Sequence, residues 1–224
     1  MSGPRLFAII PTYQHFAYAK RAVESLYLHT KEKLEVLLID DASEKWLQQD
    51  WSLWPKGMKL HHFPKNGGLT RSWNTGLRVA RDMGAEYTLC ANSDLIFTPG
   101  WLNSLVWALQ NGVDLVGPLT NAPGHRPKQR ITQYLPDYKL TDNREYLTKI
   151  AVRVRDELGS KSFIESGING FCMLARTATW WGNAFDSTNV FNPKRKMVGN
   201  EDELQKRWKK RGKLLAVALG SFVF

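Results

Sequence analysis

The sequence of 224 residues predicts an α/β fold with a mostly parallel central sheet flanked by helices. Short apolar runs alternate with segments whose apolar residues recur at helical spacing, which is the pattern of strand–helix–strand crossover units. Polar clusters at 11–13, 40–43 and 92–94 directly follow predicted strands. Because ligands bind beyond the carboxyl ends of the strands in such sheets, these clusters predict a functional site at one sheet edge.

The first half supplies most of the predicted sheet. Short, mostly apolar segments predict strands at 6–10, 34–39, 87–91 and 114–116, and a further short strand is expected at 59–63. Apolar residues fall on one helical face in the segments between them, which predicts helices at 19–26, 69–83 and from Pro99 to 109. Gly84 suits the stop of the second helix. The Trp-rich connection 46–54 shows no clear period.

The second half is less regular. Residues 118–142 are rich in Pro, Asn, Gln, Lys and Arg and predict a long loop, a feature that is usually functional or mobile in compact domains. A helix is expected over 143–158, a strand over 170–175 and a short helix over 201–211. The strand-like end, 214–224, stops without a turn, so we expect a single domain, 1–224, cut from a longer chain.

Composition points to an anionic partner. The 31 Lys and Arg outnumber the 21 Asp and Glu, giving a formal charge of +10. Nucleic acid, a membrane surface and phosphorylated small molecules all fit such a balance. The densest basic run, 206–211, is interpreted as a solvated helix end, where cations suit the helix dipole.

The remaining composition indicates a cytoplasmic domain. Cys90 and Cys172 lie in apolar runs and are expected to be free, buried thiols, so no oxidising compartment is needed. The first residues do not form a signal peptide, and no apolar stretch approaches the ~20 residues of a membrane span. We therefore expect no transmembrane segment, while peripheral association with a membrane stays open.

Four of the polar residues have both a structural and a functional interpretation. Asp40 and Asp41 are either a turn with a helix cap or carboxylates that accept from a nucleobase or ribose, and adjacent acids repel unless a donor or metal is near. Asp94 is either a cap or a ligand for a hard divalent cation that bridges a diphosphate. Arg71, behind the 66–68 turn, is either a surface residue or a phosphate ligand.

The acidic run 201–203 is the candidate for acid–base chemistry. Acids at a helix start are favoured by the dipole, and that is the structural interpretation. The functional interpretation is a general base, which sugar transfer to a hydroxyl requires. The five histidines lack zinc spacing, and no Walker, Gly-x-Ser-x-Gly or Gly-x-Gly-x-x-Gly pattern occurs.

Taken together and in order, six segments resemble the family 2 glycosyltransferases, which have the GT-A fold. Residues 9–13 resemble the family's opening strand and turn, and 38–43 its Val-Asp-Asp-Gly-Ser segment. Asn92-Ser93-Asp94 stands where the Asp-x-Asp metal motif stands. The other matching positions are Asn66, Gly67, Gly68, Arg71, Asn74 and Gly76, then 170–176 with 185–186 on the acceptor side, and Glu201-Asp202 with Leu204 and Arg207 as the base motif.

The resemblance implies inverting transfer from a nucleotide-diphospho-sugar, with UDP favoured, to a glycan or other hydroxyl acceptor. Residues 1–117 would bind the donor, and 118–224 the acceptor and the catalytic groups. Asp202 would be the base, with Glu201 its rival, and Asp94 would bind Mn²⁺ or Mg²⁺. The residues expected to contact the donor are Pro11, Thr12, Tyr13, Asp41, Asn66, Gly68, Arg71, Asn92, Ser93 and Asp94.

Two departures from the family pattern concern the metal. Asn92 replaces the first acid of the metal motif, which predicts weaker metal affinity. The family often supplies a late histidine to the metal after a strand like 220–224, where this sequence stops. If the histidine ligand lies beyond residue 224, we expect residues 1–224 to bind the donor but to turn it over poorly.

Two other functions are weighed against sugar transfer. A sugar nucleotidyltransferase usually has a Gly-rich, basic loop after its first strand, where this chain has Pro11-Thr12-Tyr13-Gln14. A non-catalytic module that binds nucleic acid or another polyanion would use the +10 charge and predicts salt-sensitive binding. We expect transfer without a nucleic-acid partner. The loop 118–142 and the Trp180-Trp181 pair are assigned to the acceptor side, although tryptophan pairs more often lie in a core.

Overall fold

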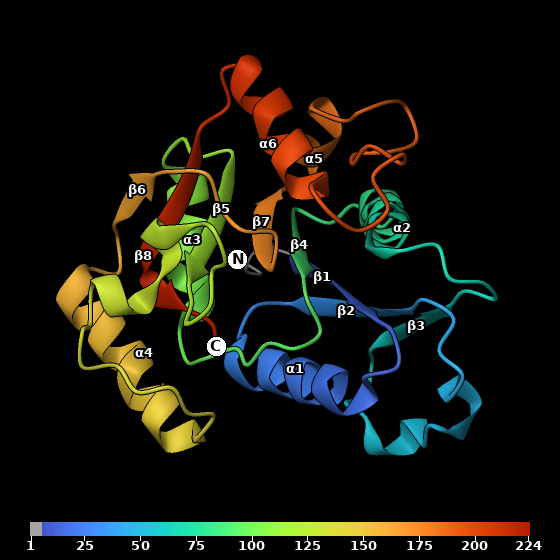
Figure 1. Ribbon diagram of the computed structural model, residues 1–224, viewed down its shortest axis with the longest axis horizontal. Helices are drawn as coiled ribbons and strands as arrows, with labels where there is room; N and C mark the ends of the chain where they lie inside the picture. The colour runs from blue at the N-terminus through green and yellow to red at the C-terminus, as the bar shows by residue number, and fades with distance from the viewer. Residues whose placement is uncertain (1–5) are drawn as a thin grey trace.

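The structure is a computed structural model that describes residues 6–224 and confirms the α/β prediction. Its sheet has eight strands in the order β3-β2-β1-β4-β7-β5-β8-β6 (Figure 1). The strands are β1 (Leu6–Thr12), β2 (Leu34–Asp40), β3 (Lys59–His62), β4 (Tyr87–Ala91), β5 (Leu115–Leu119), β6 (Phe163–Glu165), β7 (Cys172–Arg176) and β8 (Leu215–Phe222).

The sheet is mostly parallel. Strands β3, β2, β1 and β4 run parallel to one another, and β5 runs parallel to β8. Strand β7 is antiparallel to both β4 and β5, and β6 is antiparallel to β8. The parallel half thus brings the carboxyl ends of β1, β2 and β4 to one edge, as the crossover pattern predicts.

Helices cover both faces of the sheet (Figure 1). They are α1 (Phe16–His29), α2 (Leu69–Asp82), α3 (Trp101–Gln110), α4 (Arg144–Leu158), α5 (Thr177–Gly182) and α6 (Asn200–Lys210). Alternate side chains of β1 enter opposite cores, because successive residues of a strand point to opposite faces. Ala8 and Ile10 join the core beneath α1 and α3, whereas Phe7 and Ile9 join the core beneath α2, α4, α5 and α6.

The structure corrects several predicted boundaries. The helix expected from Pro99 begins at Trp101, because Gly100 adopts a left-handed φ of 77° that no helix continues through. The strand expected from 170 begins at Cys172. Strand β6 and helix α5 were not predicted, since they have three and six residues and are too short to show a period. The loop over 118–142 is confirmed from residue 120 onward, with short 3₁₀ turns at Pro127–Gln129 and Ile131–Gln133.

The Trp-rich connection and the tryptophan pair are both structural. Trp46, Trp51 and Trp54 form an aromatic cluster packed on Phe16 at the start of α1. Trp180 is completely buried and donates its indole N–H to the Thr88 carbonyl. It therefore belongs to the core, and its assignment to the acceptor side was wrong.

Helix α2 approaches β1 closely at Gly76. A Cβ atom placed there would lie 2.4 Å from Cγ2 of the buried Ile9. We expect Gly76→Ala to lower the free energy of unfolding by about 1–3 kcal/mol, because an extra methyl in a packed core forces its neighbours to move. Urea denaturation measures this. Gly182→Ala is the control, since a Cβ there meets no atom within 4 Å and should change stability by less than ~0.5 kcal/mol. Equal stability of the two variants would contradict the packing described.

Cys90 and Cys172 are free and buried, as predicted. Burial raises the pKa of both thiols, and the neighbouring Cys172 raises that of Cys90 further. Since the thiolate is the reactive form, neither cysteine should react with a thiol reagent in the native protein near pH 8. We expect the two thiols to be labelled only when the whole protein unfolds, so the labelling rate should rise with urea concentration as unfolding does. Labelling at full speed in native buffer would contradict this burial.

None of the helices within residues 6–224 is sufficiently long and apolar to span a membrane.

Candidate active site

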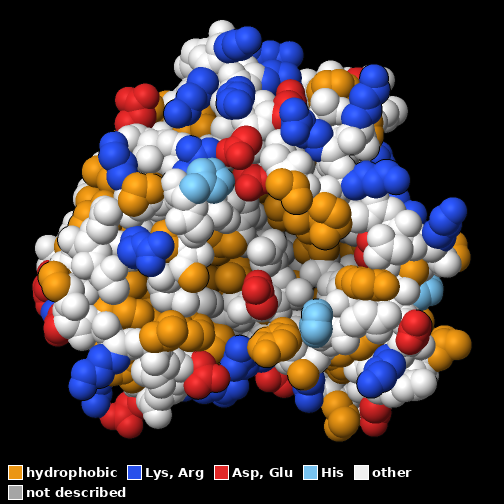
Figure 2. Space-filling view, viewed as in Figure 1, with side chains coloured by type: hydrophobic (Ala, Val, Ile, Leu, Met, Phe, Trp, Pro, Cys, Tyr) orange, Lys and Arg blue, Asp and Glu red, His pale blue; other side chains and the backbone are white. Residues whose placement is uncertain are grey.

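A cavity of about 910 Å³ opens at the edge where β1, β2 and β4 end. It collects the polar clusters that the sequence placed after these strands. On the face in Figure 2, acidic, histidine and hydrophobic side chains surround a hollow near the centre. The lining residues are Pro11, Thr12, Tyr13, His15, Tyr18, Asp41, Asn66, Leu69, Ser72, Asn92, Ser93, Asp94 and Met197. All the predicted donor-binding residues except Gly68 and Arg71 are therefore in one wall.

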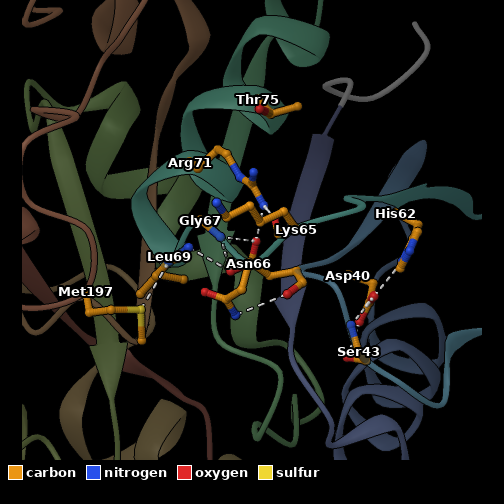
Figure 3. Close-up of polar contacts among 12 residues, drawn as sticks. Asp40, Ser43, His62, Lys65, Asn66, Gly67, Leu69, Arg71, Thr75 and Met197 are labelled. Carbon is orange, nitrogen blue, oxygen red and sulfur yellow. Dashed lines mark hydrogen bonds and ion pairs between the residues drawn. The ribbon is translucent and has the colours of Figure 1, made fainter.

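Asp41 is held by donors from the protein itself. Its carboxylate accepts from the backbone N–H groups of Gly67, at 3.0 Å, and Gly68, at 2.7 Å, and from the Arg71 guanidinium. Asn66 also donates to the Asp41 carbonyl, at 3.1 Å (Figure 3). The Gly67 N–H makes a second contact, at 3.2 Å, so four contacts reach the carboxylate, about as many as it can accept, and Asp41 is already satisfied by the protein. Asp41 thus fastens the 66–71 segment to the end of β2 as well as lining the cavity.

Asp40 has a separate, structural set of partners. Its carboxylate accepts from the Ser43 N–H, at 2.8 Å, and from the Ser43 hydroxyl, and it pairs with His62 Nδ1 at 2.7 Å. It is completely buried and is not among the residues that line the cavity; Figure 3 shows it between Ser43 and His62. The two adjacent acids are tolerated because each meets its own donors. The structural interpretation therefore holds for Asp40, and cavity lining holds for Asp41.

Gly68 and Arg71 support the cavity from behind. Arg71 packs its guanidinium 3.7 Å from the centre of the Phe63 ring while it donates to Asp41 and to the Lys65 carbonyl. Gly68 has a φ of 86°, and a Cβ there would lie 2.7 Å from the Lys196 carbonyl oxygen. Only glycine fits this combination of positive φ and close approach.

That close approach brings in a segment that the sequence analysis did not assign to the cavity. Lys196 accepts from the Thr70 N–H at 3.1 Å, and the sulfur of Met197 accepts from the Leu69 N–H at 3.3 Å. Met197 is exposed and closes the cavity over the start of α2. No sequence signal marks a contact across more than 120 residues. His15 and Tyr18 were also missed, although their position directly after the 11–13 cluster was a signal.

Asn92, Ser93 and Asp94 follow β4 directly. The Asn92 N–H donates to the Phe171 carbonyl at 2.8 Å, which fixes the start of this turn against the strand β7 side. Asp94 is exposed to the cavity and has no ion pair with any residue from 6 to 224. Within that same range, no three or more His, Cys, Asp or Glu side chains lie close enough together to hold a metal ion.

The side-chain oxygens of the 92–94 turn suit a metal ion that is held partly by the protein and partly by substrate phosphates. Mg²⁺ keeps several waters and is usually held by one or two carboxylates together with substrate phosphates. Asp94 supplies one carboxylate and Asn92 an amide oxygen in the same cavity wall. These residues therefore fit a hard cation that binds jointly with a diphosphate, and they do not form a complete protein site.

Asp202 lies in the first turn of α6 and outside the first cavity. Its carboxylate is paired with the Arg126 guanidinium, and His125 Nε2 lies 3.6 Å away. Its side chain is 34% exposed and lines a second groove. Arg126 and His125 come from the long loop, which the sequence analysis expected to be functional without naming them.

Glu201 is placed differently from Asp202. Its side chain packs against Gly170: a Cβ atom on that glycine would lie 3.1 Å from the Glu201 Cγ atom. Glu201 lines neither the cavity nor the groove. The segment 195–199 connects the two spaces, because Met197 lines the first and Arg195 and Gly199 line the second. Of the two candidate bases, Asp202 rather than Glu201 therefore lines the groove that the 195–199 segment connects to the cavity.

The fold and the cavity define the chain's class. The family model for glycosyl transferase family 2 matches residues 7–167, so the chain belongs to that family. An uncharacterized glycosyltransferase of Rickettsia felis is 30% identical over 94 residues, covering 42% of this chain and 15% of that protein. One from Rickettsia conorii is 26% identical over 98 residues, covering 43% and 16%. The chain thus spans only a small part of the length of these curated relatives.

Solved structures show the same fold. The crystal structure of GalNAc-T7 with UDP, GalNAc and Mn²⁺ superposes with a TM-score of 0.71 at 16% identity, covering 98% of this chain and 43% of that one. S. aureus TarS 1–349 gives a TM-score of 0.62 at 17% identity, covering 98% and 59%. The fold is that of the GT-A glycosyltransferases.

Proposed function

We propose that this chain transfers a sugar from a nucleotide-diphospho-sugar to a hydroxyl of a glycan or another acceptor, with inversion at the anomeric carbon. The observation that carries the proposal is the arrangement of the cavity. Residues from the polar clusters after β1, β2 and β4 line it, and the 195–199 segment connects it to the groove that Asp202 lines. Family membership favours this activity over a nucleotidyltransferase and over a polyanion-binding module.

The donor would occupy the cavity, with its nucleoside against Thr12, Tyr13 and Asn66. A uracil imide that reached the Asp41 carboxylate would take the place of one of its protein donors, so the preference for UDP rests on the family resemblance rather than on a free acceptor position. One fold neighbour was solved with UDP, GalNAc and Mn²⁺, which supports testing UDP-sugars and manganese first. Localisation in the cytoplasm remains part of the proposal.

In the proposed reaction, Asp202 removes the proton of the acceptor hydroxyl. The acceptor oxygen then forms the glycosidic bond on the face of the anomeric carbon opposite the diphosphate, and the bond to the diphosphate breaks with its electron pair. Arg126 holds the Asp202 carboxylate in place. When bound beside Asp94 and Asn92, Mn²⁺ or Mg²⁺ supplies positive charge for the leaving group.

The stereochemistry gives a direct test. Water can replace the acceptor, and ¹H NMR distinguishes the anomers of the released sugar before they equilibrate. From α-linked UDP-sugars, we expect the β-anomer first, together with UDP. The α-anomer first would contradict inversion, and no nucleoside diphosphate released from any sugar nucleotide would contradict the transferase.

A further inference from the structure

A second open groove, of about 620 Å³, runs along α6. Figure 2 shows basic side chains gathered at the top of the molecule, where Figure 1 places this helix. Five basic and two acidic residues supply the lining, together with Gly199: Arg195, Asp202, Glu203, Lys206, Arg207, Lys210 and Arg211. Asp202, the candidate base, therefore lies in a groove whose basic side chains outnumber its acidic ones.

Most of these cations have no protein partner. Arg207 pairs with Glu203 at 3.1 Å and donates to the Asn183 and Val190 carbonyls. Arg195, Lys206, Lys210 and Arg211 are exposed and make no ion pair with any residue between 6 and 224. The helix dipole accounts for cations in the last turn of α6, but it does not account for Arg195 or Lys206.

The helix places these charges at fixed distances from Asp202. Lys206 and Lys210 follow it at intervals of four residues, so the three side chains form one stripe. At a rise of 1.5 Å per residue, the two ammonium-bearing positions stand about 6 and about 12 Å along the axis from the carboxylate. One end of the groove is thus acidic and the other basic.

We propose, on the basis of the proposed function, that the acceptor is anionic and lies along α6. Its hydroxyl meets Asp202, and a phosphate or carboxylate one to two helical turns away meets Lys206, Lys210 and the neighbouring arginines. A neutral glycan would leave the four unpaired cations without a partner. A continuous nucleic-acid backbone would place phosphates against Asp202 and Glu203, which repel them, so the polarity of the groove favours an acceptor with one uncharged, hydroxyl-bearing end.

Inorganic tripolyphosphate is the probe for the basic end. Calorimetry compares the wild-type chain with Lys206→Glu/Lys210→Glu and with Lys31→Glu/Lys56→Glu as a control. Lys31 and Lys56 are exposed and have no ion pair among the described residues; they lie in the connections before β2 and before β3 and do not line the groove. Both variants change the net charge equally. We expect tripolyphosphate affinity to fall about ten-fold or more only in the α6 variant, because reversed charges beside the anion repel it.

Equal affinity in all three proteins, equal loss in both variants, or no binding to wild type would overturn the proposal. Tighter binding of oligothymidylate than of tripolyphosphate through the same two lysines, at one salt concentration, would also overturn it in favour of a nucleic-acid surface. Amide NMR shifts confined to 195–211 on adding tripolyphosphate would support the site. Nucleotide binding, measured in the same three proteins, should be unchanged, and its absence from wild type would refute the proposed function separately.

Discussion

Asp202→Asn is expected to lower sugar transfer by about 10²- to 10⁴-fold, the range that a positioned general base contributes. The substitution keeps the shape of the side chain and removes its ability to take the acceptor proton. Asp202 lies outside the cavity that we propose binds the donor, so the affinity for the nucleotide-sugar should be unchanged. Initial rates of nucleoside diphosphate release and calorimetry on the same protein measure the two quantities.

Two neighbouring acids serve as controls for Asp202. Glu203→Gln removes a carboxylate that lines the same groove but is paired with Arg207, and it should retain most of the activity. Glu201→Gln tests the rival base, whose side chain packs beside Gly170. Wild-type activity in Asp202→Asn would exclude Asp202 as the base, and loss in Glu201→Gln instead would transfer that role to Glu201.

Asp94→Ala is expected to abolish the metal dependence of donor binding. Asp94 is the single carboxylate of the 92–94 turn and is exposed to the cavity, so its removal leaves a hard cation without its charged protein ligand. Donor affinity with Mn²⁺ should fall to the value measured in the presence of a chelator. Calorimetry with and without Mn²⁺ gives both values for the variant and for wild type.

Asp82→Ala is the matched control for Asp94. Asp82 is an exposed aspartate at the end of α2, and its partner is the adjacent Arg81. The Asp82→Ala variant should show the same increase in donor affinity on adding Mn²⁺ as the wild-type protein. A wild-type response to Mn²⁺ in Asp94→Ala would mean that the metal binds elsewhere.

Most of the parallel half of the sheet was predictable from sequence because β1, β2 and β4 are largely apolar runs closed by polar residues. Parallel strands end at one edge, so the clusters after β1, β2 and β4 had to meet, and Thr12, Asp41 and Asp94 do line one cavity. Arg71 was predicted to contact the donor, but it does not line the cavity. Its guanidinium is engaged by Asp41 and Phe63 behind the wall.

The contacts that complete the site could not be predicted, because they join residues far apart in the sequence through irregular backbone. Met197 reaches the start of α2 only because Gly68 lets the Lys196 carbonyl approach. Arg126 meets Asp202 from a loop without periodicity. The basic run at the end of α6 was interpreted as solvated, and its lysines and Arg211 are exposed, whereas Arg207 is largely buried and pairs with Glu203. The stripe that Lys206 and Lys210 form with Asp202 depends on helix geometry and on the groove beside it.

The central claim is that the cavity at the ends of β1, β2 and β4 binds a nucleotide-sugar. Calorimetry with UDP, GDP, dTDP and their sugar conjugates, with and without Mn²⁺, tests it most directly. We expect tight, Mn²⁺-dependent binding of one nucleotide family, with UDP favoured. Weak binding that is equal for all nucleotides and is abolished by salt would contradict the claim and indicate a module that binds polyanions through its net positive charge.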